Sequence, residues 1–157
     1  MISQETLKTA KRIAEELFVR LEADAAVASK IQEETSILVE VTMKEPQMFI
    51  GEKGQTLGEI QHVFRMMVRK KLQEQAFVFL DINEYRKSKE AYLRELARSA
   101  ADEVALLKKD KELPVMSSSE RRIVHMELGE RTDVVAESQG EDPDRRIVVR
   151  IKQQPLT

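Results

Sequence analysis

Apolar side chains recur at steps of three and four residues near the start of the chain, and this spacing predicts an amphipathic first helix. The stripe comprises Leu7, Ala10, Ile13, Ala14, Leu17, Phe18 and Leu21. Apolar and polar positions then alternate on both sides of the polar turn 33–36, which predicts a pair of strands at 27–31 and 37–41. Pro46 suits the first turn of a short helix that extends to Ile50, because a missing N–H is tolerated there.

A further amphipathic helix is predicted from about residue 56 to about residue 72. Its apolar stripe comprises Leu57, Ile60, Val63, Phe64, Met67 and Val68. Thr56 and Glu59 fit the S/T-x-x-E pattern of an N-terminal capping box. The short apolar and aromatic segment 76–82 then predicts a mostly buried strand. The predicted order through Ile82 is helix, strand, strand, helix, helix, strand.

The helical pattern restarts at Asn83 without a linker rich in Pro, Gly or Ser. A long helix to about Lys108 is predicted to bury one apolar stripe, comprising Leu93, Leu96, Ala97, Ala100, Val104 and Leu107. We therefore expect two domains, residues 1–82 and 83–157.

The rest of the second domain is predicted to contain one more helix and three strands. Ser117 and Glu120 form a second capping-box pattern, for a helix that ends near Gly129. The strand-like segments are 111–116, 133–138 and 145–152. The last two are joined by a polar loop rich in turn-forming residues. Both halves therefore combine helices with small sheets, and the predicted fold class is α+β.

The composition and charge of the chain exclude several classes of protein. The 157 residues carry a net charge of −2 and contain no cysteine, so neither a strongly basic domain nor a disulfide framework is expected. There is no apolar run near the 18 or so residues of a membrane span, and the N-terminus lacks the features of a signal peptide. We expect a cytoplasmic protein without membrane contact, whose nucleic-acid contacts, if present, are local.

The tetrapeptide Gly51-Glu52-Lys53-Gly54 lies between two predicted helices. Two glycines permit a tight turn and leave no side chains to keep a ligand's backbone away. The N-terminus of the following helix would add N–H groups and a partial positive charge, which favour a phosphate. The alternative is that the tetrapeptide is only a turn between helices.

A basic motif, Arg121-Arg122-Ile123-Val124-His125, lies on the predicted helix after Ser117. Arg121 and His125 are four residues apart and share one helical face, whereas Arg122 points aside. Arg146 and Arg150 fall on one face of the last predicted strand and extend the basic surface. The alternative is an exposed helix whose arginines pair with Glu120, Glu127 or Asp144.

The order of elements around the glycine loop resembles a type II K-homology (KH) domain, with the order α-β-β-α-α-β. The Arg-x-x-x-His motif and its flanking residues resemble an R-3-H domain, in which helices pack on a three-stranded sheet. Together they resemble the bacterial Jag (SpoIIIJ-associated) family of KH and R-3-H RNA-binding proteins. Many members have an additional N-terminal domain, and we expect no segment of these 157 residues to form it.

The resemblance implies single-stranded RNA as the ligand, with single-stranded DNA as a second candidate. The implied KH contacts are Gly51, Glu52, Lys53, Gly54, Ile50 and Leu57. An aliphatic floor for bases is expected from Ile50, Leu57, Ile60 and Val39. The implied R-3-H contacts are Arg121, Arg122, His125, Arg146 and Arg150. Glu52 departs from the basic residues common in binding-competent loops, because a carboxylate repels phosphate.

The resemblance also implies a bacterial post-transcriptional regulator linked to cell elongation, division or sporulation, acting with a small KH-domain protein or as a homodimer. No enzyme is expected: two histidines and no cysteine give no zinc pattern, and the Walker phosphate loop is absent. No cofactor is expected either. The alternative function is a protein-interaction adaptor that uses a degenerate KH fold for dimerisation, which Glu52 and the acidic balance favour.

Overall fold

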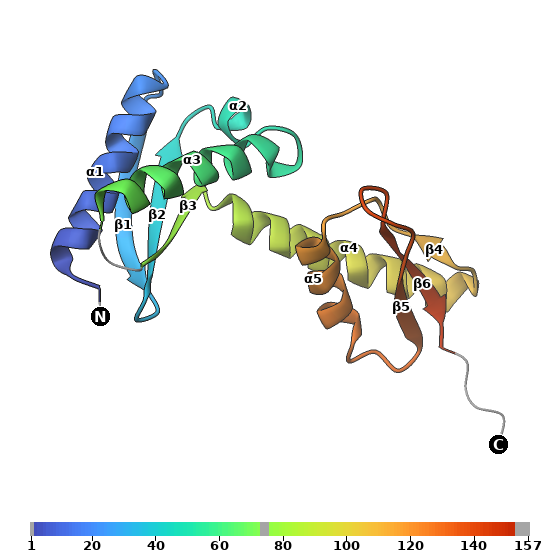
Figure 1. Ribbon diagram of the computed structural model, residues 1–157. Helices are drawn as coiled ribbons and strands as arrows, with labels where there is room; N and C mark the ends of the chain where they lie inside the picture. Colours follow the sequence, from blue (N-terminus) through green and yellow to red (C-terminus); the bar gives the residue numbers. More distant parts are fainter. Residues whose placement is uncertain (1, 73–75, 153–157) are drawn as a thin grey trace. The chain divides into compact units, whose positions relative to one another are not determined.

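The computed structural model describes residues 2–72 and 76–152 and divides the chain into two compact units, Met1–Arg86 and Lys87–Thr157. Figure 1 shows the order of their helices and strands along the chain. Each unit has its own hydrophobic core.

The first unit contains three helices, a short 3₁₀ turn and a three-stranded sheet. Its elements are α1 (Gln4–Arg20), β1 (Ala25–Gln32), β2 (Ser36–Met43), α2 (Gln47–Ile50), η1 (Glu52–Gly54), α3 (Gln55–Lys71) and β3 (Phe77–Ile82). This order is the one predicted from the apolar pattern. The strand order is β1-β2-β3, with β1 antiparallel and β3 parallel to β2.

The parallel pairing of β2 with β3 explains the place of the glycine loop. Ser36 pairs with Phe77 and Val41 with Ile82, so the chain must cross from the end of β2 back to the start of β3. Parallel neighbours need such a crossover, usually a helical one. Here α2 and α3 form it, and Figure 1 shows α3 crossing the strands of the sheet. The glycine loop is the corner between these two helices.

The core of the first unit forms between the helices and one face of the sheet. Its buried side chains include Ile13 and Phe18 from α1, Phe64 and Val68 from α3, and alternate residues of the strands. The strand residues are Ile37, Val39, Val41, Val78, Leu80 and Ile82. One core therefore contains the inward-facing alternate residues of β2 and β3 and the apolar faces of α1 and α3.

Gln61 lies on the buried face of α3, together with Leu57, Phe64 and Val68. Its amide donates to Val78 O at 3.0 Å and accepts from Leu80 N at 2.7 Å. Arg86 Nη2 also donates to Gln61 Oε1 at 3.2 Å. These bonds satisfy backbone groups on the free edge of β3, which would otherwise be unpaired. Gln61 thus fixes α3 against β3.

The second unit packs two helices on a second three-stranded sheet. Its elements are α4 (Tyr85–Leu107), β4 (Lys111–Glu112), α5 (Ser118–Leu128), β5 (Val134–Gln139) and β6 (Arg146–Ile151). The strand order is β4-β6-β5, and both pairs are antiparallel. This is the predicted succession of helix, strand, helix, strand, strand.

The core of the second unit joins α4, α5 and the central strand β6. Buried side chains include Ala97 and Val104 of α4, Val124 of α5, and Ile147 and Val149 of β6. Val148 is also buried, although the alternating pattern predicts that it faces solvent. The strand face that carries Arg146 and Arg150 is therefore buried at Val148, although both arginines remain partly exposed.

The strand predicted at 111–116 is wrong in length. Only Lys111 and Glu112 pair with β6, although Leu113 N still donates to Ile147 O at 2.8 Å. Pro114 follows, and a proline has no N–H to continue the ladder. The remaining residues of this segment therefore form the loop that leads to α5.

Within residues 2–72 and 76–152, no helix is both long enough and apolar enough to cross a membrane. The same residues contain no group of three or more His, Asp or Glu side chains placed to hold a metal ion.

Candidate nucleic-acid interface

The glycine loop depends on backbone conformations that favour glycine. Gly51 has φ of +72° and Gly54 has φ of +81°. A Cβ added to Gly51 would lie 2.1 Å from Thr56 Oγ1, and one added to Gly54 would lie 2.6 Å from Tyr85 Cε1. The space freed by both glycines is thus taken by neighbouring side chains. The turn is held in one tight conformation by packing within the first unit.

The start of α3 differs from the predicted capping box. Its N-cap residue is Gly54, and no side chain caps the helix. Thr56 lies inside the first turn, and Glu59 accepts from Gln55 Nε2 at 3.4 Å instead of capping the helix. Gly54 is selected because its position requires a left-handed backbone. The first-turn N–H groups of α3 are therefore not covered by a capping side chain.

The two middle residues of the loop carry opposite charges. Glu52 and Lys53 are both exposed, and Lys53 has φ of +53°. No ion pair involves either side chain within residues 2–72 and 76–152. The loop therefore presents one free ammonium and one free carboxylate beside the uncapped helix end, and its side-chain charge is zero.

The four side chains of the predicted aliphatic floor lie at different depths. Leu57 is only 4% exposed and belongs to the core, as does Val39 at 0%. Ile50 and Ile60 are half-buried and pack against that core from its margin. Only these last two side chains retain surface beside the loop. Leu57 supports the loop from beneath, because it anchors the first turn of α3.

The second candidate surface begins at α5. Ser117 Oγ accepts from Glu120 N at 3.3 Å, and Ser117 N donates to Glu120 Oε2 at 2.7 Å. The predicted capping box is therefore confirmed. Burial alone would raise the pKa of Glu120, but the Ser117 N–H and the Lys89 ammonium outweigh it and lower that pKa. The box fixes the first residue of the helix that carries the basic motif.

Arg121 does not lie on the surface, contrary to the prediction. It is 7% exposed, and its Nη1 donates to Met116 O at 2.7 Å and to Asp142 Oδ1 at 3.1 Å. Through Met116 the guanidinium thus links α5 to the loop before it, and through Asp142 it links α5 to the polar loop between β5 and β6. Arg122 is exposed instead, and the described part of the chain contains no ion pair of its guanidinium.

His125 lies one helical turn after Arg121 and is half-buried. Its Nε2 lies 2.8 Å from Ser138 Oγ on β5, so this hydrogen bond orients the ring. Either atom can be the donor, depending on the tautomer. The imidazole therefore lies at the junction of α5 and the sheet, held by a hydroxyl rather than by an acid.

The predicted basic strip on β6 is largely neutralised by acids. Arg146 Nη1 lies 3.2 Å from Glu112 Oε2. Arg150 pairs with Glu137 through Nη1 at 2.9 Å and with Asp110 through Nε at 3.0 Å. The alternative expectation of acidic partners concerns the arginines of the helix, and of these Arg121 pairs with Asp142.

The acids named in that alternative have other contacts. Glu120 pairs with Lys89, and Glu127 pairs with Arg94 and Arg98. Asp144 offers only its backbone carbonyl to Arg146 Nε, at 3.4 Å. No local pattern indicates the true pairs, because they join residues 13 to 40 positions apart that only the sheet brings together.

Comparison with known proteins places a family domain on the second unit. The R-3-H domain matches residues 91–150. The matched range includes all of α5, β5 and most of β6, and thus the Arg121-to-His125 motif.

Three bacterial proteins, each named RNA-binding protein KhpB, are similar to most of the chain. The protein from Clostridium symbiosum is 33% identical over 77% of this chain and 55% of its own length. The one from Lactiplantibacillus plantarum is 34% identical over 67% of this chain and 33% of its own. The one from Bacillus subtilis is 30% identical over 71% and 55%. The chain therefore spans about a third to a half of these relatives.

Proposed function

Because this chain belongs to the Jag/KhpB type of R-3-H-domain proteins, we propose that it binds single-stranded RNA and holds it without chemical change. This family is not enzymatic. The observation that carries the proposal is the glycine loop placed before the uncapped N-terminus of α3. A helix N-terminus attracts phosphate through its free N–H groups and partial positive charge.

We further propose that residues 1–82 form a type II KH domain and residues 83–157 the R-3-H domain. The order of elements in the first unit, the parallel β2–β3 pair and the place of the loop between α2 and α3 support the KH assignment. KH domains clamp the backbone of about four nucleotides with such a loop. In this proposal Lys53 pairs with a phosphate, and Ile50 and Ile60 contact bases.

In the second unit the proposed contacts are Arg122 and His125, with Arg146 and Arg150 alongside. Arg121 acts as a positioning residue, because its guanidinium is buried against Asp142. The ion pairs of Arg146 and Arg150 are partly exposed, and such pairs contribute only about 0–1 kcal/mol. A phosphate can therefore replace a carboxylate at these guanidinium groups at little cost. Arg146 and Arg150 would thus bind phosphate by exchanging their acidic partners for it, whereas the exposed Arg122 has no such partner among the described residues.

The role as a bacterial post-transcriptional regulator linked to cell elongation, division or sporulation belongs to the same proposal. The second candidate function is a protein-interaction adaptor. Two observations favour it: the exposed Glu52 in the loop and the acidic partners of Arg146 and Arg150. An adaptor would associate with a small KH-domain protein or with itself and would not bind RNA.

Binding at several salt concentrations tests the proposal. A labelled uridine-rich RNA of 12 nucleotides and the same sequence as DNA are titrated with the protein between 50 and 300 mM salt. The logarithm of the affinity should fall linearly with the logarithm of the salt concentration, by about 0.7 per phosphate neutralised. No binding at 50 mM salt, together with elution as an oligomer, would instead support the adaptor.

Lys53→Glu and Arg122→Glu test the two surfaces. Each should weaken RNA binding and make its salt dependence shallower, since each removes a phosphate contact. Lys8→Glu is the matched control for charge, because Lys8 is exposed on α1 of the first unit. Equal affinity of all three variants would reject the assignment of these surfaces.

A further inference from the structure

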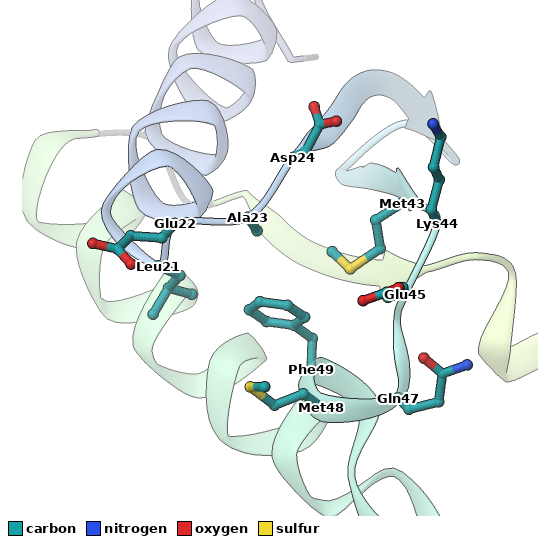
Figure 2. A pocket seen from close by; sticks show the side chains of 10 residues that line it. All are labelled: Leu21, Glu22, Ala23, Asp24, Met43, Lys44, Glu45, Gln47, Met48 and Phe49. Carbon is teal, nitrogen blue, oxygen red and sulfur yellow. The ribbon is translucent and has the colours of Figure 1, made fainter.

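The first unit contains an open pocket of about 730 Å³ that the RNA proposal does not use. It lies where the turn after α1, the end of β2 and the start of α2 meet. The residues that line it are Leu21, Glu22, Ala23, Asp24, Met43, Lys44, Glu45, Gln47, Met48 and Phe49. Figure 2 shows the Phe49 ring and the Met43 thioether at its centre, with Glu22, Asp24 and Lys44 at its edge.

The inner wall of the pocket is apolar and reaches solvent. Phe49 is half-buried and contacts Phe18 of the core, with ring centroids 6.1 Å apart. Leu21 is 42% exposed, and Met48 is 79% exposed. A flexible, polarisable methionine beside an aromatic ring can adapt to an incoming apolar side chain. Burial of this apolar surface by a ligand is favourable, because it removes the surface from water.

The rim of the pocket is negatively charged. Three acidic residues line the pocket, Glu22, Asp24 and Glu45, together with one basic residue, Lys44. Within the part of the chain that the structure describes, no ion pair involves any of these four side chains. Three unneutralised carboxylates repel a phosphate backbone and attract ammonium or guanidinium groups. The charge pattern therefore selects against RNA and in favour of a basic ligand.

We propose that this pocket binds a segment of a partner protein in which one or two large apolar side chains are flanked by lysine or arginine. The apolar side chains enter beside Phe49 and Met48, and the basic groups pair with Glu22, Asp24 and Glu45. In protein interfaces, buried apolar side chains commonly provide much of the affinity. The charged groups around them determine orientation and the association rate. The proposal does not depend on RNA binding.

Selection from a displayed library of random 12-residue peptides tests the proposal. The full chain is the target. Counter-selection on the Met48→Lys variant discards peptides that bind outside the pocket. Met48 is so exposed that the variant should fold, which circular dichroism checks. The expected consensus contains one or two Leu, Ile, Phe or Trp with neighbouring Lys or Arg. A consensus without basic residues, or no peptide that distinguishes the two proteins, overturns the proposal.

Charge reversal at the rim gives the second measurement. The best peptide is labelled and titrated by fluorescence anisotropy against the chain and against the double variant Glu22→Lys/Glu45→Lys. Its affinity should fall at least tenfold, and a version of the peptide with Glu in place of Lys and Arg should bind the double variant more tightly than the wild type. The double variant Glu33→Lys/Glu34→Lys is the matched control, because these exposed residues lie in the turn between β1 and β2.

Three other outcomes would overturn the proposal. Equal loss in the control variant would show attraction to overall charge rather than to the pocket. Self-association of the wild type that Met48→Lys abolishes would show that a second copy occupies the pocket. Loss of RNA affinity in Met48→Lys would assign the pocket to RNA. Unchanged RNA affinity in this variant, with loss of the peptide, supports the peptide site independently of the function proposed above.

Discussion

Arg121 Nη1 lies 3.1 Å from Asp142 Oδ1 and 2.7 Å from the carbonyl oxygen of Met116. The guanidinium is 7% exposed, whereas Asp142 lies on the polar loop between β5 and β6. The first arginine of the motif therefore ties two loops to α5. This leaves Arg122 and His125 as the motif residues that can reach a ligand.

Arg121→Ala should destabilise the second unit. The substitution leaves the Met116 carbonyl without its donor, and a buried unsatisfied group costs about 1–3 kcal/mol. We expect a loss of about 2 kcal/mol in the free energy of unfolding, measured by urea denaturation. Arg122→Ala is the matched control and should change that free energy by less than about 0.5 kcal/mol, because its side chain is exposed. Similar stability of the two variants would contradict the structural role of Arg121.

Gly54→Ala should destabilise the first unit, whereas Gly58→Ala should stabilise it. Gly54 has φ of +81°, and a Cβ there would lie 2.6 Å from Tyr85 Cε1, so we expect a loss of about 1–3 kcal/mol. Gly58 lies within α3, and no atom lies within 4 Å of its added Cβ. Alanine there should contribute about 0.5–1 kcal/mol. Thermal and urea unfolding of both variants measure the difference, and destabilisation by both would contradict this account of the loop.

The helices and most strands could be predicted because each has a periodic apolar face that is repeated over several residues. The α1 stripe and the α5 capping box are examples, since both signals are local in sequence. The start of α3 could not be placed in the same way. Thr56 and Glu59 fit a capping box, yet the left-handed conformation required at Gly54 places the cap two residues earlier. Two local signals for the start of α3 conflict, and the backbone conformation at Gly54 determines where the helix begins.

The candidate site was harder to predict than the fold, because burial and pairing depend on contacts distant in sequence. Arg121 and Arg122 differ in helical phase, and Arg121 lies on the buried face of α5 with Val124 and Leu128. Its partners Met116 and Asp142 come from outside the helix, and no local pattern indicates them. The partners of Arg146 and Arg150 come from other strands and loops. The role of Gln61 had one available signal, namely a polar residue within the apolar stripe between Leu57 and Phe64. A buried amide at such a position indicates a backbone partner.

Glu120 should make the second unit less stable in acid. Its pKa in the folded protein lies below the ordinary value of 4.5, so the folded state binds this proton less readily than the unfolded state. The stabilisation is therefore fully present above pH 4.5 and is lost as pH falls through the folded pKa. Glu120→Gln should remove this part of the pH dependence, up to about 1 kcal/mol because the pair with Lys89 is partly exposed.

Urea unfolding of both proteins at pH 7 and pH 3.5 measures this difference. The exposed Glu130, just beyond the end of α5, provides the control, since Glu130→Gln should retain the wild-type pH dependence. If Glu120→Gln lost as much stability in acid as the wild type, the capping box would not be a source of the pH dependence.

Glu52→Lys should strengthen RNA binding, because it replaces a free carboxylate beside the proposed phosphate site with an ammonium group. Two unit charges a few ångströms apart interact by about 1 kcal/mol in water, so removal of a repulsion and addition of an attraction amount to about 2 kcal/mol. Because salt screens exposed charges, binding should become about tenfold to thirtyfold tighter at 50 mM salt. The salt dependence should steepen by about 0.7, the value for one more neutralised phosphate on a single strand. Glu34→Lys adds the same charge to the β1–β2 turn and should change neither quantity as much. Equal gains from both variants would indicate attraction to net charge alone, whereas a gain confined to Glu52→Lys would locate the phosphate at the glycine loop.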